Sequence, residues 1–352
     1  MGFGGPFSLV LSGGGLKGLA HVGVLLALEE RGLEPELVVG SSMGALIAAA
    51  WAAGVPARTL EAGGLKVKRR DIFQVAHADM AFKRMKAPAV YRREPLYALI
   101  RSVIGDVRFE ELPRRLFINT VELDSGMQVF WGLPGLRDAR VADAVLASCA
   151  LPGLFPPVEI GGRHYVDGAV LENLPVSAAA ALGQAPVLAV DVGSTAALRA
   201  NVQEEGFAAT YARGLEIVMQ AMMESRLRRW SRPPLLLLHP RVEHVSMFAF
   251  GQNREIIEEG RRATLDLLDR LPATLPAEAE GIFPQRMVEV RVDAARCIGC
   301  GACAMQAPQV FGMSEGKAVV RQPRQCWSPL DGSYVRNCPT YAISARFAPP
   351  AG

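Results

Sequence analysis

The sequence predicts an α/β protein with a mainly parallel sheet covered by helices on both faces, followed by a smaller module. Residues 7–11 and 36–40 are short, continuously apolar segments, and each runs through glycines into a helical segment, 16–32 and 43–54. Buried strands that alternate with helices are typical of a parallel sheet in a layered domain. The 352 residues, half of them hydrophobic, suffice for one large core and a second small module.

Later segments continue this pattern. We expect strands at 116–123, 127–131, 163–167 and 186–193, helices at 141–150, 175–183, 206–231 and 253–271, and a basic, irregular region at 57–112. The composition changes at 271–284, where three prolines alternate with small residues, which indicates a linker. The predicted organisation is therefore a large domain at 1–272, a linker at 273–286, a small domain at 287–346 and a tail at 347–352.

Composition and charge exclude some classes of function. The net charge of +3 is too small to indicate nucleic-acid binding. No export signal and no run of about 20 apolar residues is visible, so we expect a cytoplasmic protein. The segment 66–101 holds ten Lys or Arg against three acids. We interpret it either as a lid or patch for anionic lipid at the inner membrane face, or as an ordinary solvated surface.

The segment "VVGSSMGALIAAAWAAG" places Ser42 at the centre of a Gly-x-Ser-x-Gly motif, between Gly40 and Gly44. A strand that turns at once into a helix strains the backbone at the central residue, and glycines on either side avoid clashes. The bend exposes the hydroxyl near the start of the next helix, where a developing negative charge is favoured. Ser42 is thus a candidate nucleophile.

A second glycine cluster, "GGGLKG", follows the first strand and opens the first helix. Its members are Gly13, Gly14, Gly15, Lys17 and Gly18. One interpretation is a dinucleotide fingerprint, although no carboxylate ends the second strand to bind a ribose. The other is an oxyanion hole, in which consecutive glycines present backbone N–H groups beside Ser42.

A serine nucleophile needs a base. None of the five histidines lies in a catalytic-looking context, and we expect His21, inside the first helix, to be structural. Asp167, followed by Gly168 and Ala169, ends a strand and enters a loop, where a parallel sheet presents functional side chains. An ordinary aspartate is a weak base for serine, so this role requires burial or favourable geometry.

The chain resembles bacterial patatin-like phospholipases over residues 7–195, and loosely to about 270. The resemblance rests on three motifs in this order, "GGGLKG", "GSSMG" and "DGA", and on the segment around the third, "ASCALPGLFPPVEIGGRHYVDGAVLENLPV". The resemblance implies a patatin-like three-layer α/β/α fold and serine-dependent hydrolysis of lipid acyl esters by a Ser–Asp dyad. Ser42 would be the nucleophile, Asp167 the base, and the loop 13–18 the oxyanion hole, with Lys17 where Arg or Lys is usual. Ser12 departs from plant members, which carry Asp there.

Five of the six cysteines lie in the last fifth of the chain. Three of them, Cys297, Cys300 and Cys303, are spaced two residues apart, and Cys338 precedes a proline. This is the ligand pattern of one [4Fe–4S] cluster, and a structural zinc site is the alternative. Residues 287–346 resemble single-cluster bacterial ferredoxins, with 287–292 and 342–345 as paired terminal strands.

Two positions depart from ferredoxin patterns. A two-cluster ferredoxin would have cysteine in place of Ala307 and a second Cys-x-x-Cys run, so one cluster is expected. Some single-cluster relatives pair the positions of Ala307 and Cys326 in a disulfide, and here Cys326 would be a free thiol.

Three functions remain open. The first is a patatin-like phospholipase or lysophospholipase whose ferredoxin-like domain serves electron transfer, redox sensing or docking to a redox partner, with no bound nucleotide. The second is a dinucleotide-binding electron-transfer protein. The third is a redox-responsive membrane adaptor without turnover.

Overall fold

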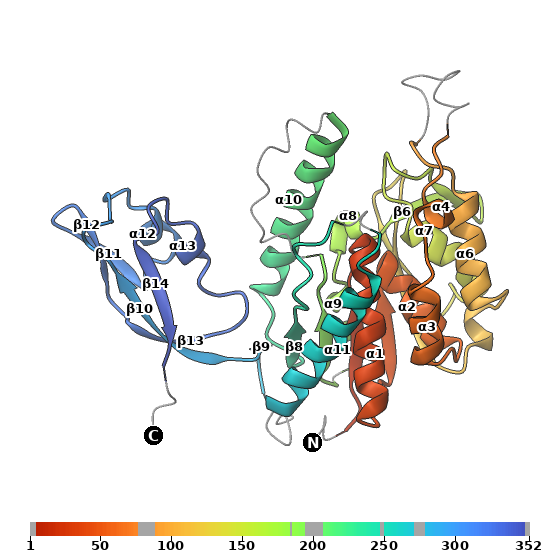
Figure 1. Ribbon diagram of the computed structural model, residues 1–352, viewed down its shortest axis with the longest axis horizontal. Coiled ribbons are helices and arrows are strands. Elements are labelled where there is room, and N and C mark those ends of the chain that lie inside the picture. Colours follow the sequence, from red (N-terminus) through yellow and green to blue (C-terminus); the bar gives the residue numbers. More distant parts are fainter. Residues whose placement is uncertain are drawn as a thin grey trace. The chain divides into compact units, whose positions relative to one another are not determined.

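A computed structural model describes residues 5–76, 89–183, 185–193, 207–246, 250–270 and 279–348 (Figure 1). Part of the basic segment (77–88), the first part of the predicted linker (273–278) and the end of the tail (349–352) lie outside the described residues. The chain divides into two compact units. The first comprises Met1–Arg226 and Ser231–Gly281, and the second comprises Leu227–Trp230 and Ile282–Gly352.

One mainly parallel sheet organises the first unit. Its strands are β1 (Ser8–Leu11), β2 (Leu37–Gly40), β3 (Arg115–Glu122), β4 (Gln128–Trp131), β5 (Val158–Ile160), β6 (Arg163–Asp167), β7 (Val187–Val190) and β8 (Leu235–Leu238). The order across the sheet is β5-β6-β3-β2-β1-β7-β8, and β4 pairs with β3. Five neighbouring strands of the sheet are parallel, in the order β3, β2, β1, β7 and β8. Strands β4, β5 and β6 add antiparallel pairs. The central strands are buried on both faces, as continuously apolar strands predict.

Helices flank the sheet, which makes the three-layer α/β/α fold. They are η1 (Gly15–Leu19), α1 (Ala20–Glu30), α2 (Met43–Ala52), α3 (Ala57–Gly64), α4 (Arg69–Ile72), α6 (Glu94–Ile104), η3 (Phe109–Glu111), α7 (Val141–Ser148), α8 (Ala169–Glu172), α9 (Val176–Leu182), α10 (Phe207–Leu227) and α11 (Asn253–Arg270). Helix α1 packs along α11, α2 packs on β2 and β3, and α9 packs on β1, β2 and β7. Within the described residues, no helix is long and apolar enough to cross a membrane.

The prediction of an irregular region at 57–112 was wrong. Helices α3, α4 and α6 and the 3-10 turn η3 occupy much of this range. In α6, Leu96, Ile100 and Ile104 recur every fourth residue and are all buried, so one apolar stripe packs the helix against the domain. The dense positive charge around this stripe obscured its period.

The second unit has its own small core and sheet. It contains β9 (Ile282–Phe283), β10 (Arg286–Val292), α12 (Ala302–Gln306), β11 (Phe311–Ser314), β12 (Lys317–Val320), β13 (Arg324–Trp327), α13 (Ser333–Arg336) and β14 (Ile343–Phe347). Strand β10 pairs antiparallel with β14, which are the two terminal strands expected from the sequence, and also with β13. Phe347, assigned to the tail, instead pairs with Val288 in this sheet.

Candidate active site

Ser42 lies on the bend between β2 and α2. Its backbone is in the left-handed region, with φ 53° and ψ −125°, a conformation that residues other than glycine rarely adopt. A Cβ on Gly44 would lie 2.4 Å from the carbonyl oxygen of Leu11, and a Cβ on Gly40 would lie 2.5 Å from the Cα of Ala45. Both flanking positions therefore require glycine because backbone comes too close for any side chain.

Hydrogen bonds hold the strained turn in place. The Ser42 N–H donates to the Ser148 hydroxyl at 2.9 Å, and that hydroxyl donates to the Asn119 carbonyl at 2.7 Å. Ser148 is fully buried at the end of α7. The end of α7 and strand β3 thus fix the bend that carries the candidate nucleophile.

Asp167 ends β6 and lies beside Ser42. The carboxylate is 2% exposed and accepts a 2.9 Å hydrogen bond from the Ala169 N–H. Burial raises the pKa of Asp167 from 3.8 to about 7, and hydrogen bonds from the Ala169 N–H and the Ser42 side chain oppose this rise. A carboxylate with a pKa near neutrality suits general-base catalysis far better than an ordinary aspartate.

The strand that places Asp167 beside Ser42 runs in a different direction from the one expected. Strand β6 is antiparallel to β3, so Asp167 is not at the carboxyl end of a parallel strand. Asp167 pairs with Thr120, and Gly40 at the end of β2 pairs with Ile118 of the same strand β3. This register places the end of β6 close to the bend that carries Ser42.

The glycine loop lies on the other side of Ser42. A Cβ on Gly13 would lie 2.9 Å from the Ser42 Cβ, so the loop packs directly on the candidate nucleophile. The Gly13 N–H is already used, because it donates to the Asn173 carbonyl at 3.2 Å. Among the described residues, the N–H groups of Gly14 and Gly15 have no hydrogen-bond acceptor. Gly18 instead packs closely on the Met43 side chain.

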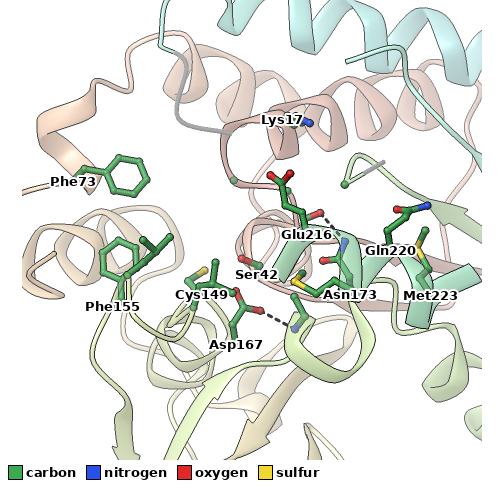
Figure 2. A pocket seen from close by; sticks show the side chains of 18 residues that line it. Lys17, Ser42, Phe73, Cys149, Phe155, Asp167, Asn173, Glu216, Gln220 and Met223 are labelled. Carbon is green, nitrogen blue, oxygen red and sulfur yellow. Dashed lines mark hydrogen bonds between the residues drawn. The ribbon is translucent and has the colours of Figure 1, made fainter. Parts of the chain in front are cut away.

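These residues face one cavity of about 100 Å³ (Figure 2). Its lining comprises Gly13, Gly14, Gly15, Lys17, Ser42, Phe73, Cys149, Leu151, Leu154, Phe155, Asp167, Ala169, Asn173, Gly193, Glu216, Met219, Gln220 and Met223. The structure thus brings Ser42, Asp167, Ala169, Lys17 and the first three loop glycines together, with Gly40, Gly44 and Gly168 behind them as backbone positions.

The apolar part of the cavity was missed by sequence reasoning. Met219 and Met223 of α10 line the cavity, and Met223 is also buried. On another side, Phe73 and Phe155 stack with ring centroids 5.9 Å apart. The sequence offered no signal for these residues, since they come from separate elements that only the fold unites.

Cys149 is a second possible nucleophile in the same cavity. Burial and the neighbouring Asp167 charge raise the pKa of its thiol well above 9.0, and a hydrogen bond with Ser42 opposes this only in part. A neutral thiol is a poor nucleophile. The environment therefore favours Ser42 over Cys149 for nucleophilic attack.

The nearby histidines do not face Ser42. His21 is fully buried in α1, its Nε2 lies 2.9 Å from the Ser12 carbonyl oxygen, and burial lowers its pKa to about 4, so it is a neutral structural residue, as expected. His239 lies 3.3 Å from the buried Asp191, and the other carboxylate oxygen of Asp191 accepts a 2.9 Å hydrogen bond from the Gly193 N–H at the cavity wall. This pair supports the cavity wall and does not reach Ser42.

In the second unit, the four predicted cysteine ligands line a single small cavity. The backbone N–H of Ala318 points at the Cys297 sulfur at 3.4 Å, and that of Ala342 points at the Cys338 sulfur at 3.3 Å. Such N–H groups stabilise negatively charged sulfur. Gly299, with φ +71°, packs its Cα on the Gly316 carbonyl, where a Cβ would lie 2.1 Å away.

Cys326 stands apart from this cavity, exposed and unpaired in any disulfide. In the part of the chain that the structure describes, no three His, Cys, Asp or Glu side chains are grouped closely enough to hold a single metal ion.

Comparisons with known protein families agree with the division of the chain into two units. The family model described as patatin-like phospholipase matches residues 9–180, and the model described as the 4Fe-4S single cluster domain of ferredoxin I matches residues 292–345. The first match supports a patatin-like phospholipase domain that contains Ser42 and Asp167. The second lends weaker support to a fused single-cluster domain.

Several curated relatives are described as NTE family proteins. An uncharacterized NTE family protein of Mycobacterium tuberculosis is 28% identical over 288 residues, 76% of this chain and 47% of that protein. Another is 33% identical over 201 residues, 56% of this chain and 50% of that protein. The lysophospholipase NTE1 of Yarrowia lipolytica is 32% identical over 205 residues, 54% of this chain and 13% of the yeast protein. The chain thus spans about half the length, or less, of the curated relatives it matches.

Solved structures show more distant similarity. VipD from Legionella pneumophila aligns with a TM-score of 0.42 and 16% identity over 75% of this chain and 66% of VipD. ExoU from Pseudomonas aeruginosa, solved in complex with SpcU, aligns with a TM-score of 0.41 and 19% identity over 76% of this chain and 53% of the matched chain.

Proposed function

We propose that the first unit is a serine-dependent lipid acyl ester hydrolase of the phospholipase or lysophospholipase type, with Ser42 as nucleophile and Asp167 as base. The observation that carries the proposal is the contact between a strained, half-buried serine that lines the cavity and a buried carboxylate whose pKa is raised to about 7. The patatin-like family match and the lysophospholipase among the relatives support lipid esters as the substrate class.

The reaction follows from the positions of the groups. Asp167 accepts the proton of the Ser42 hydroxyl while the oxygen attacks the ester carbonyl carbon. The free N–H groups of Gly14 and Gly15 stabilise the oxyanion. As the C–O bond to the lipid alcohol breaks, Asp167 returns the proton to the leaving oxygen.

Water completes the cycle. Asp167, again ionised, removes a proton from water, whose oxygen attacks the acyl-serine ester. As the bond between the acyl carbon and the Ser42 oxygen breaks, Asp167 returns this proton to Ser42, which frees the serine and the fatty acid. The hydrocarbon chain would lie against the apolar cavity wall formed by Phe155, Met219 and Met223. The thiol of Cys149 stays neutral throughout because burial and Asp167 keep its pKa high.

The same proposal assigns one [4Fe–4S] cluster to the second unit, held by Cys297, Cys300, Cys303 and Cys338. Supporting it are the shared cavity of the four cysteines, the backbone N–H groups aimed at two of the sulfurs and the match to a single-cluster domain. When bound, the cluster supplies one-electron chemistry, for electron transfer, redox sensing or docking to a redox partner.

The basic segment would let the protein bind peripherally to anionic membrane, at the inner face in a cytoplasmic setting. Lys66, Lys68 and Arg69 are exposed, and no described residue forms an ion pair with them. Clustered cations of this kind attract anionic lipid surfaces at roughly 1 kcal/mol each near the surface.

The test is fatty-acid release from anionic phospholipid vesicles by anaerobically purified protein, with Ser42→Ala as the blank. Each preparation is assayed with the cluster oxidised and then reduced. Release that requires Ser42 supports the hydrolase, and a rate that changes with redox state supports regulation by the cluster. No Ser42-dependent release from phospholipid, lysophospholipid or simple acyl esters would refute the proposal.

A further inference from the structure

A second cavity of about 320 Å³ lies beside the active-site cavity, lined by residues of η1, α2, α3, α4 and α6 and of the segments that follow α2 and α3. None of its lining residues lines the cavity that contains Ser42. The two are nevertheless adjacent along the chain. Leu16, Met43 and Ile72 line the second cavity, and the residue next to each, Lys17, Ser42 or Phe73, lines the first.

The second cavity is almost entirely apolar. Among the described residues that line it, only Thr59 and Ser102 have polar side chains, and the Ser102 hydroxyl is satisfied by the Leu99 carbonyl of its own helix at 2.7 Å. Water in an apolar space of this size finds few hydrogen-bond partners. Its volume falls in the range of about 300–1,000 Å³ that is typical of small-molecule sites.

Positive charge adjoins this apolar surface. Lys66, Lys68 and Arg69 immediately flank Val67, which lines the cavity, and all three are exposed without an ion-pair partner among the described residues. The Asn253 amide of α11 anchors this segment by donating to the Gly64 carbonyl at 2.8 Å. An apolar cavity with a cationic border complements a molecule that has a hydrocarbon chain and an anionic head.

We infer that the second cavity binds a single-chain anionic lipid, a free fatty acid, with its hydrocarbon chain inside and its carboxylate near Lys66, Lys68 and Arg69. The binding itself is independent of turnover. Only the idea that the protein supplies its own ligand, as the product of ester hydrolysis, rests on the proposed function.

Met43 connects this site to the candidate catalytic residues. Its side chain lines the second cavity and packs on Gly18, where a Cβ would lie 2.3 Å from the Met43 Cγ. Met43 also directly follows Ser42 at the start of α2. A bound chain would therefore press on the residue that joins the glycine loop to the nucleophile bend, and it would stabilise the folded first unit by mass action.

Photolabelling locates the ligand directly. The full-length Ser42→Ala protein, which cannot turn over, is irradiated with a photoreactive analogue of lauric acid, and the labelled peptides are identified by mass spectrometry. We expect labels in 57–72 and 94–104, removed by excess unlabelled laurate. Labels confined to 149–155 and 216–223, which belong to the active-site cavity, or labels that laurate does not displace, would overturn the inference.

A matched pair of variants on α6 tests the cavity. Val103 lines it and Ala98 is an exposed residue of the same helix. Val103→Trp should reduce labelling at 57–72 and 94–104 by about tenfold, and Ala98→Trp by less than about twofold, because only the first fills the space. If the two variants lose labelling equally or keep it equally, the result would count against the site. If Val103→Trp fails to fold, the positions of the labelled peptides in the Ser42→Ala protein and their displacement by laurate test the site without it.

The head-group interaction is tested with the uncharged alcohol. Dodecanol should compete about tenfold less well than laurate, and a combined Lys66→Gln, Lys68→Gln and Arg69→Gln variant should remove that difference. Equal competition in the otherwise unaltered chain would overturn the cationic part of the site. Labelling of this cavity without any Ser42-dependent hydrolysis would uphold the site and refute the proposed function. Ser42-dependent hydrolysis without labelling of this cavity would refute the site and support the proposed function.

Discussion

The backbone N–H of Ser42 donates a 2.9 Å hydrogen bond to the hydroxyl of Ser148, 106 residues further along the chain. Ser42 has a positive φ, so its conformation persists only where the surroundings impose it. Because the Ser148 hydroxyl also donates to Asn119, it is oriented to accept from Ser42. The candidate nucleophile is therefore positioned by a residue that does not line the cavity.

Ser148→Ala should reduce Ser42-dependent fatty-acid release and destabilise the first unit by about 1–3 kcal/mol, since it leaves a buried N–H without an acceptor. Activity and the free energy of unfolding are measured on the same preparation. Ser344→Ala, at an exposed strand position, is the control and should change neither. Full activity and stability in Ser148→Ala would show that the bend needs no such support.

The raised pKa of Asp167 predicts a pH dependence of hydrolysis. The base acts when ionised, so kcat/KM should increase about tenfold per pH unit below pH 7 and level off above it. The measurement is a kcat/KM profile between pH 5 and 9 on a soluble short-chain ester, which avoids changes in vesicle charge. A profile that is flat from pH 5 to 7 would contradict a base with this pKa.

Stability should show the opposite trend. The folded state holds the Asp167 proton up to about pH 7, whereas the unfolded chain releases it near 3.8, so this group stabilises the fold at low pH and the contribution is lost as pH rises through 7. Asp167→Asn should remove that part of the decline in unfolding free energy between pH 4 and 7, while abolishing activity. An unchanged slope in chemical denaturation would show that Asp167 ionises normally in the fold.

Local sequence was sufficient to predict the nucleophile bend. Gly40 and Gly44 are needed because backbone comes within 2.4–2.5 Å of any Cβ, and this requirement is visible as a pentapeptide between a strand and a helix. The alternation of buried strands and helices likewise predicted the layered fold. Features of this kind depend on residues that are neighbours in the chain.

Features that depend on tertiary proximity were not predictable. Ser148 and Cys149 reach Ser42 because α7 ends there, and Met219 reaches the cavity from a helix that also suits a buried core. The position of Asp167 was predicted, but for the wrong reason, since strand direction is a property of the sheet and not of the segment. Single-sequence patterns do not encode such register.

An ion pair between α10 and the last residue of α8 supports the helix that carries the cavity methionines. Arg226 of α10 lies 2.8 Å from Glu172, which is 3% exposed and also accepts hydrogen bonds from Gln128 and Ser177. Arg226→Gln should destabilise the unit by about 1–3 kcal/mol, because the buried carboxylate loses its cation, although Arg226 is partly exposed.

The kinetic effect of Arg226→Gln should appear mainly as a raised KM for long-chain esters, since α10 contributes the apolar wall and not the reacting groups. Arg262→Gln is the control, because Arg262 is exposed and its pairs with Glu259 and Asp266 contribute at most about 1 kcal/mol. If the two variants behave alike in denaturation and in KM, Glu172 does not anchor the helix.

The cysteines of the second unit give a prediction with an internal control. Cys338 lines the shared cavity and receives the Ala342 N–H, which together with neighbouring N–H groups holds its thiol pKa below the usual value despite burial. Cys326 is exposed and lies outside the cavity. Cys338→Ala should therefore lower the iron content from about four per chain to below about one, whereas Cys326→Ala should leave it unchanged.

Iron and acid-labile sulfide are measured on anaerobically reconstituted protein, together with the visible absorption of the cluster. Because a metal site couples to folding, Cys338→Ala should also make residues 286–348 more susceptible to proteolysis. Zinc without sulfide in the unaltered chain would instead support a structural zinc site. Equal iron loss in both variants would show that Cys326 is a ligand and that the four-cysteine assignment is wrong.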